Sequence, residues 1–198
     1  MLSYKALGLT LGVSALAASA QPAGPSPRFE AGVNYAYNNV STSSAAQSNQ
    51  NGAALFGEYF FKAARPQWGG RSELGISAEF AGSGSGSGSL YTYLFGPRWG
   101  LAWRHVRWYG GITAGGARVR VNGVDLPGSP QSFTRDSPAV SFAQVGVELL
   151  LGERFVVKLI QADDLAFEAP DPATGRMHWQ GGLRASGGVA FRFGQRKP

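Results

Sequence analysis

The chain has 198 residues, among them 29 Gly and no Cys, with 43% hydrophobic, 12% aromatic and 15% charged residues and a formal net charge of +6. So little charge with so many aromatic residues excludes a disordered chain, and the lack of Cys excludes disulfides and a thiolate metal site. No apolar run beyond the N-terminus reaches the roughly 18 to 20 residues of a membrane-spanning helix. The composition therefore favours a single Gly-rich, aromatic-rich, all-β domain.

The first 20 residues have the pattern of a secretory signal peptide. Lys5 supplies a positive n-region, residues 6–17 form an apolar h-region, and an Ala-Ser-Ala cleavage site stands at 18–20. A short buried helix is the alternative interpretation of this segment. We expect a signal peptide over 1–20, a proline-containing lead-in over 21–27, and an exported protein.

After the lead-in, apolar residues recur at every second position, which is typical of strands with two different faces. The strands predicted from this pattern are 28–38, 52–62, 71–81, 90–102, 106–117, 139–151, 155–165 and 177–194. In the seventh, Lys158 and Gln161 have opposite parity, which predicts a β-bulge between them. All eight exceed the roughly 5 to 6 residues of a typical soluble strand and reach the roughly 9 to 11 that cross a bilayer.

The predicted connections alternate in length along the chain. The longer ones are 39–51, 82–89, 118–138 and 166–176, and the shorter ones are 63–70, 103–105 and 152–154. Alternate connections of a meander lie at the same end, so this pattern is typical of long outer loops and short periplasmic turns. We predict an eight-stranded up-and-down antiparallel transmembrane β-barrel over 28–194 with a short tail at 195–198; a soluble sandwich or lipocalin-like barrel is the alternative.

A strand crosses hydrocarbon only in a closed barrel, because every backbone donor and acceptor must be paired there. Aromatic side chains then gather at the two membrane interfaces. The expected girdle comprises Tyr35, Tyr37, Tyr91, Tyr93, Trp99, Trp103, Trp108, Trp179 and Phe193. The polar face would fill a narrow lumen, where its charged members would pair: Glu58, Lys62, Glu73, Glu79, Arg98, Glu148, Arg184 and Arg192. These charges are expected to hold the barrel together, with a narrow proton or ion path as the alternative.

Candidate catalytic and metal-binding residues are few. His178 and Ser186 share a face of the last predicted strand but stand about 26 Å apart, so they cannot react together. A Ser in a loop leaves a lipid-modifying enzyme as an alternative. Asp163, Asp164 and Asp171 could bind a hard cation weakly, but a solvated acidic rim is the simpler interpretation. We expect no catalytic residues, no metal and no cofactor.

The basic residues are scattered rather than gathered on one face, so we expect no nucleic-acid binding. Three of them, Arg118, Arg120 and Arg135, fall in the third predicted outer loop. Their charge is better matched to anionic lipopolysaccharide or to another anionic surface ligand.

Four stretches carry a family pattern: Phe29 to Tyr37, Tyr91 to Arg98, Gln161 to Asp163, and Gly187 to Gly194. Together they resemble the small OmpA/OmpX-type eight-stranded outer-membrane β-barrel family, and the alternating aromatic end is similar to the signal read by the barrel-assembly machinery. The resemblance implies a monomer in contact with outer-membrane lipid and lipopolysaccharide. Loop length and composition favour a structural, adhesion or ligand-contact role; a narrow porin-like channel is the first alternative.

Overall fold

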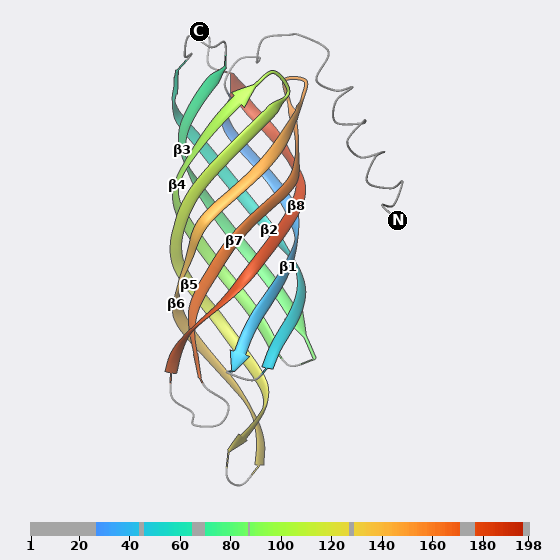
Figure 1. The fold of residues 1–198 in the computed structure, drawn as a ribbon, viewed down its shortest axis with the longest axis vertical. Helices are drawn as coiled ribbons and strands as arrows, with labels where there is room; N and C mark the ends of the chain where they lie inside the picture. The colour runs from blue at the N-terminus through green and yellow to red at the C-terminus, as the bar shows by residue number, and fades with distance from the viewer. Residues whose placement is uncertain are drawn as a thin grey trace, which may run out of the picture.

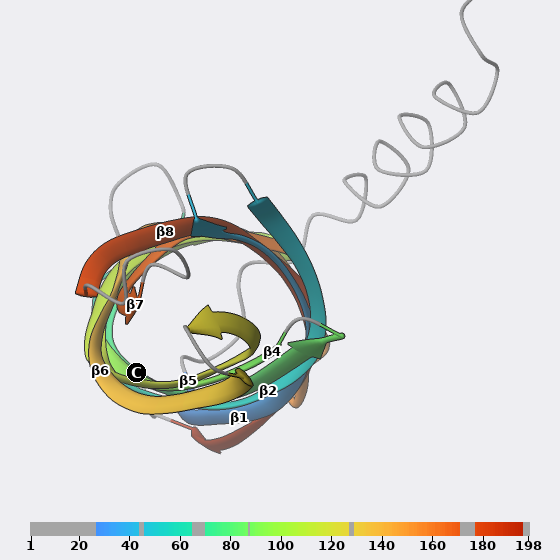
Figure 2. The same ribbon diagram turned by 90° about the horizontal axis from the view of Figure 1, so that it is seen from below.

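The computed structural model describes residues 27–43, 46–64, 70–86, 88–126, 129–170 and 177–195. The strands are β1 (Pro27–Ser43), β2 (Ala46–Ala64), β3 (Arg71–Ser85), β4 (Gly88–Trp103), β5 (Val106–Leu126), β6 (Ser129–Leu151), β7 (Phe155–Pro170) and β8 (Met177–Gln195). Each pairs antiparallel with the next, and β8 returns to pair with β1 (Figures 1 and 2). This closed barrel confirms the predicted fold. No helix in these ranges is long and apolar enough to cross a membrane.

The strands end at two distinct ends of the barrel. The start of β1 and the end of β8 lie at the end shown at the top of Figure 1, which we call the terminal end. The short predicted turns lie there too, at 104–105 between β4 and β5 and at 152–154 between β6 and β7. The opposite end, called the far end below, carries the connections β1–β2, β3–β4, β5–β6 and β7–β8.

Strand pairing continues much further at the far end than the sequence pattern predicted. The predicted loop 39–51 is mostly strand, since Asn39 pairs with Asn49 and the ladder runs on to Ser43 and Ala46. Most of the predicted loop 118–138 is likewise paired between β5 and β6. The predicted loop 82–89 is also mostly strand, since residues 82–85 pair with residues 88–91. The prediction of long outer loops is therefore wrong for these three connections. Their Asn-, Ser- and Gly-rich composition marks contact with water rather than irregular backbone, because a ladder needs only backbone groups.

Among the register shifts of the barrel, those in β7 and near Ala143 of β6 adjust the direction of side chains. The β7–β8 register shifts between Lys158 and Gln161, which confirms the predicted bulge and turns both side chains inward. The β5–β6 and β6–β7 registers shift near Ala143, which takes a positive φ of 49°. That value is uncommon for a residue with a Cβ and is accommodated here by the bulge.

The barrel carries its apolar side chains outside and its charged side chains inside. All nine residues of the predicted girdle are exposed on the outer face, from Tyr37 at 38% to Trp108 at 61%. Their places on the strands divide them between the two ends: Trp99, Trp103 and Trp108 flank the β4–β5 turn at the terminal end. A soluble barrel has the opposite arrangement, because exposing large apolar side chains to water costs about 25 cal/mol per Å².

Candidate functional site

The interior of the barrel holds a continuous group of buried charged side chains, which we call the main cluster. Every one of the eight strands contributes to it: Glu30, Glu58, Arg71, Glu73, Arg98, Arg107, Glu148, Lys158 and Arg192. Inward-facing positions alternate with outward-facing ones along a strand, so single charges from distant segments converge on the axis. The main cluster therefore joins all the strands through side chains.

Arg107 is the centre of the main cluster. It is fully buried, and its guanidinium donates to Glu30 (Nη1 to Oε1, 2.9 Å), Glu73 (Nη1 to Oε2, 3.0 Å) and Glu148 (Nε to Oε2, 2.6 Å). Each of these carboxylates has another base, since Arg71 donates to Glu73 at 2.7 Å, Arg192 to Glu30 at 3.1 Å and Arg98 to Glu148 at 2.9 Å. Charges this deep in a protein are tolerated only when they are paired and hydrogen-bonded.

Arg98 and Lys158 form the second half of the main cluster. Arg98 donates from Nη2 to both carboxylate oxygens of Glu148, at 2.9 Å each, and from Nη1 to Glu58. Lys158 donates to Glu58 at 3.0 Å, and its Nζ lies 3.5 Å from the centroid of the Phe56 ring. Lys158 thus combines carboxylate pairing with a contact to a buried aromatic face, as Arg98 does with the ring of Tyr109.

A second group, the far-side cluster, lies closer to the far end. Arg184 donates to Asp163 (Nε to Oδ1, 2.9 Å; Nη2 to Oδ2, 2.7 Å) and to Glu79. Tyr109 and Gln161 link the two clusters. The Arg98 guanidinium lies 3.7 Å from the Tyr109 ring centroid, and the Tyr109 hydroxyl donates to Gln161 at 2.8 Å. Gln161 in turn donates from Nε2 to Oδ2 of Asp163 at 3.4 Å. The main cluster holds five bases and four acids and the far-side cluster one base and two acids, so together they are neutral.

The Tyr109 side chain has room in the interior because the residue opposite it on β6 is Gly146, which has no side chain. A Cβ added at Gly146 would overlap the Tyr109 ring and hydroxyl. We expect Gly146→Ala to displace Tyr109 and destabilise the barrel by about 1–3 kcal/mol, as overpacking of a core does. Denaturant unfolding of the refolded protein in detergent micelles measures this. Gly181→Ala is the matched control, because the nearest atom to its added Cβ is 3.6 Å away; an equal loss in both variants would contradict the role of Tyr109.

Seven of the eight predicted lumen residues lie in the two clusters, and the side chain of Lys62 is outside the described residues. Five further members of the two clusters were not among the predicted lumen charges: Glu30, Arg71, Arg107, Lys158 and Asp163. The interpretation of Asp163 as part of a solvated rim is wrong, because the bulge in β7 turns it inward onto Arg184. After the bulge, every second residue is buried, at 161, 163, 165 and 167. Counting alternate positions from Gln161 instead of from the start of the strand could therefore have identified Asp163 as an inward residue.

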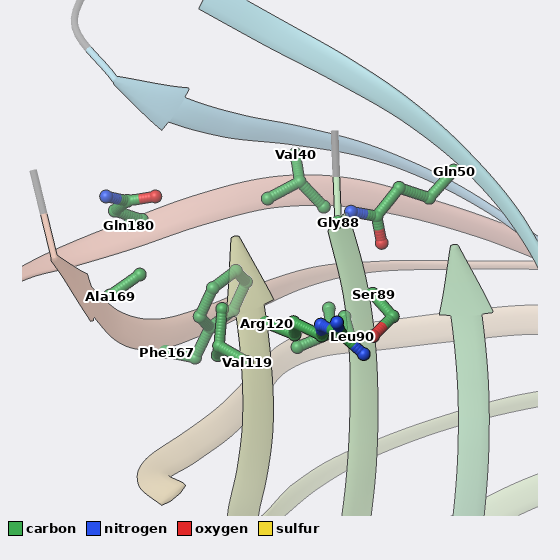
Figure 3. A pocket seen from close by; sticks show the side chains of 10 residues that line it. All are labelled: Val40, Gln50, Gly88, Ser89, Leu90, Val119, Arg120, Phe167, Ala169 and Gln180. Atoms are coloured by element: carbon green, nitrogen blue, oxygen red, sulfur yellow. The ribbon is translucent and has the colours of Figure 1, made fainter. Parts of the chain in front are cut away.

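Buried apolar layers lie in the interior on both sides of the charges. At the far end the layer comprises Val40, Leu90, Leu94, Ala117, Val119, Ala139, Leu165, Phe167 and Ala169. Toward the terminal end it comprises Phe56, Ala102, Leu150, Val156 and Ala190. Figure 3 shows a pocket in the far-end layer, where Val119 and Phe167 lie near one another; the centre of a water molecule can reach only about 10 Å³ of it. That is room for about one water molecule.

The residues weighed for catalysis and metal binding do not form a site. His178 is exposed near the start of β8, whereas Ser186 lies further along the same strand and faces the interior. Asp164 is exposed on the outer face, and Asp171 lies outside the described residues. Within the ranges that the structure describes, no group of three or more His, Asp or Glu side chains could hold a metal ion.

Comparison with known proteins agrees with a barrel whose apolar side chains lie outside and whose charged side chains lie inside. The model of the outer membrane protein beta-barrel domain family matches residues 8–160. The chain belongs to this family. The protein is therefore an integral protein of the outer membrane. None of the curated proteins matches the chain.

Solved structures of outer-membrane barrels are similar to this member of the family. Neisserial surface protein A is 16% identical, with a TM-score of 0.57 over 86% of this chain and 100% of that one. The N-terminal β-barrel domain of Pseudomonas aeruginosa OprF is 12% identical, with a TM-score of 0.44 over 85% and 100%. Ail, the attachment invasion locus protein of Yersinia pestis, is 17% identical, with a TM-score of 0.48 over 84% and 99%. The likeness to the neisserial protein is a likeness of fold alone.

Proposed function

We propose that this protein is a closed outer-membrane anchor that holds its β5–β6 hairpin outside the cell, for contact with molecules beyond the membrane. One observation carries the proposal. The pairing of β5 with β4 ends at Val121, and that of β6 with β7 begins at Ala139. Residues 122–126 of β5 therefore pair with no strand except β6, and residues 129–138 of β6 pair with no strand except β5. Figure 1 shows this hairpin beyond the rim, and Figure 2 shows it over the barrel opening.

The closed interior supports an anchor over the porin-like alternative. Paired charges fill the centre, and buried apolar side chains lie on both sides of them. We expect the purified protein to leave the conductance of a planar bilayer unchanged. Reproducible single-channel steps that persist after further purification would contradict this expectation and favour the porin-like channel.

The closed ladder also supports a monomer. A barrel has no free strand edge within its membrane-spanning part, so a second copy has no backbone there with which to pair. The alternating aromatic residues of β8 near its end support delivery by the barrel-assembly machinery.

Cysteine labelling in intact cells tests which end is outside. The chain has no Cys, so Thr134→Cys in the hairpin and Arg154→Cys in a terminal-end turn each supply a single thiol at an exposed position. We expect a membrane-impermeant maleimide to label Thr134→Cys in intact cells, and Arg154→Cys only after the outer membrane is permeabilised. The reverse pattern would overturn the proposed orientation and, with it, the exposed hairpin.

A further inference from the structure

The main cluster contains more bases than acids, and the excess lies in the part around Arg107. The other part is balanced, since its bases Arg98 and Lys158 are paired with two acids, Glu58 and Glu148. The part around Arg107 has three bases and two acids, namely Arg71, Arg107, Arg192, Glu30 and Glu73. Arg107 also donates to Glu148, but counting that acid here would leave Arg98 and Lys158 with a single carboxylate. Since buried charges need counter-charges, this part lacks one negative charge.

Arg192 is the base of this part that has an unused donor. The residue is only 6% exposed, and its Nε donates to Glu30 at 3.1 Å. Its Nη2 is also buried and has no hydrogen-bond partner among the described residues. A buried N–H group without an acceptor is unfavourable. A ligand that brings both an acceptor oxygen and a negative charge would satisfy this donor and balance the charge.

Arg71 brings a further positive charge to the same place. Nη1 of Arg107 donates to both Glu30 and Glu73. Arg192 is bonded to the first of these carboxylates and Arg71 to the second, so the two arginines flank one nitrogen of Arg107 through one carboxylate each. An anion bound at Nη2 of Arg192 would therefore lie among three guanidinium groups.

The Arg192 side chain lies near the mouth of the barrel at the terminal end. Two residues further along β8 stands Gly194, which is exposed and has no side chain. The atoms nearest to a Cβ added at Gly194 all belong to the side chain of Arg28, at 3.5–3.9 Å. Arg28 is exposed. The way from the mouth to Arg192 along β8 thus passes a glycine and another arginine.

The surface charges favour anions at the terminal end and not at the far end. Around the terminal end, outside the main cluster, the described charged side chains are three bases and one acid: Arg28, Arg104, Arg154 and Glu153. At the far end, outside the far-side cluster, three described bases and three acids balance: Arg118, Arg120, Arg135, Asp136, Asp164 and Glu168. A positive rim raises the local concentration of anions. Anions are therefore attracted to the end that is nearest to the uncompensated charge of the main cluster.

We propose that the interior of the barrel at the terminal end binds a small oxyanion, a carboxylate or a phosphate, on the guanidinium of Arg192, with Arg71 and Arg28 beside it. Guanidinium N–H groups match the oxygens of both anions in geometry and charge. The site goes beyond the proposed function, since it lies at the end opposite to the hairpin. In the orientation proposed above, the anion comes from the periplasm, either as free phosphate or as the carboxylate of a periplasmic molecule.

Titration of the arginine side chains tests the site. The full-length protein, labelled with ¹⁵N and refolded in micelles of an uncharged detergent, is titrated with sodium phosphate or sodium acetate, and the Nε–H signals are followed by NMR. Sodium chloride at equal ionic strength is the reference. We expect a saturable shift of the Arg192 signal, which its loss in Arg192→Gln identifies, and no such shift for Arg118 at the far end. Saturation by phosphate alone would identify phosphate as the ligand, and saturation by acetate would identify a carboxylate; either result supports the site.

Variants then test which side chains carry the binding, followed through the Arg71 signal. We expect Arg192→Gln to weaken binding about tenfold or more, because a charge-assisted hydrogen bond is lost, and Arg28→Gln to weaken it several-fold. Arg118→Gln is the matched control and should bind as the unchanged protein does. A boiling-dependent mobility shift on SDS gels verifies that each variant is folded. If Arg192→Gln does not fold, Arg192→Lys keeps the charge beside Glu30 but lacks Nη2, and it should show the same loss of binding.

Several results would overturn the site. These are an Arg192 signal that moves no further with phosphate and acetate than with sodium chloride, undiminished binding in folded Arg192→Gln or Arg192→Lys, and an equal loss in Arg28→Gln and Arg118→Gln. The titration uses purified protein and does not depend on orientation. A reversed labelling pattern in cells would therefore refute the proposed function and leave the anion site in place, with only the side of entry changed.

Discussion

Replacing Arg107 with methionine is expected to destabilise the barrel by about 3–5 kcal/mol, the cost of removing one partner from a buried ion pair. Methionine keeps much of the length of the side chain but leaves Glu30, Glu73 and Glu148 without their shared guanidinium. Arg71, Arg192 and Arg98 remain beside these carboxylates, yet none of them spans all three. Denaturant unfolding in detergent micelles measures the loss.

The matched control for this substitution is Arg154→Met. Arg154 is an exposed residue of the β6–β7 turn, so its charge is hydrated and its replacement should change the free energy of unfolding by less than about 0.5 kcal/mol. If Arg107→Met unfolds at the same denaturant concentration as Arg154→Met, the main cluster does not hold the barrel together. A narrow proton path would then become the better account of the buried charges.

The sequence was sufficient for the architecture because a membrane barrel imposes a simple two-residue pattern. Val33, Tyr35 and Tyr37 face outward and Asn34 and Ala36 inward, as strict alternation requires. Alternation failed only where the backbone departs from it. Asp163 follows the β7 bulge, and counting from the start of the strand puts it on the wrong face.

The extent of the strands and the partners of the charges lay beyond the sequence pattern for a different reason. Strand pairing in the β1–β2 and β5–β6 hairpins is carried by backbone groups, which every residue type supplies, so Asn- and Ser-rich segments gave no sign of it. The pairing of Arg107 with Glu30 depends on the stagger of distant strands around the barrel, which one chain's periodicity does not encode. The position of Arg107 in the sequence, beside a turn, gave no indication that it lies at the centre of the main cluster.

Replacing Val33 with arginine is expected to cost about 2–4 kcal/mol when the protein is folded in lipid vesicles, because a lipid-facing charge at the bilayer midplane is desolvated. Val33 is exposed, stands midway along β1 between the outward residues Phe29 and Tyr37, and pairs in register with outward Leu55 and Val189. Its immediate surroundings are therefore apolar, with no acid on the outer face of either neighbouring strand at that level. Equilibrium unfolding of the barrel in vesicles measures the cost.

The same substitution at the interface provides the comparison that identifies hydrocarbon as the cause. Tyr37 lies two outward positions further along β1, within the girdle, so Tyr37→Arg should cost only about 0–1 kcal/mol because the guanidinium can reach water and headgroups. The difference between the two sites should shrink in short-chain detergent, where a thin apolar layer lets the guanidinium introduced by Val33→Arg reach solvent. Equal costs in vesicles would mean that the outer face of β1 meets no hydrocarbon at Val33, and the exposed apolar belt would then need a protein partner instead of a bilayer.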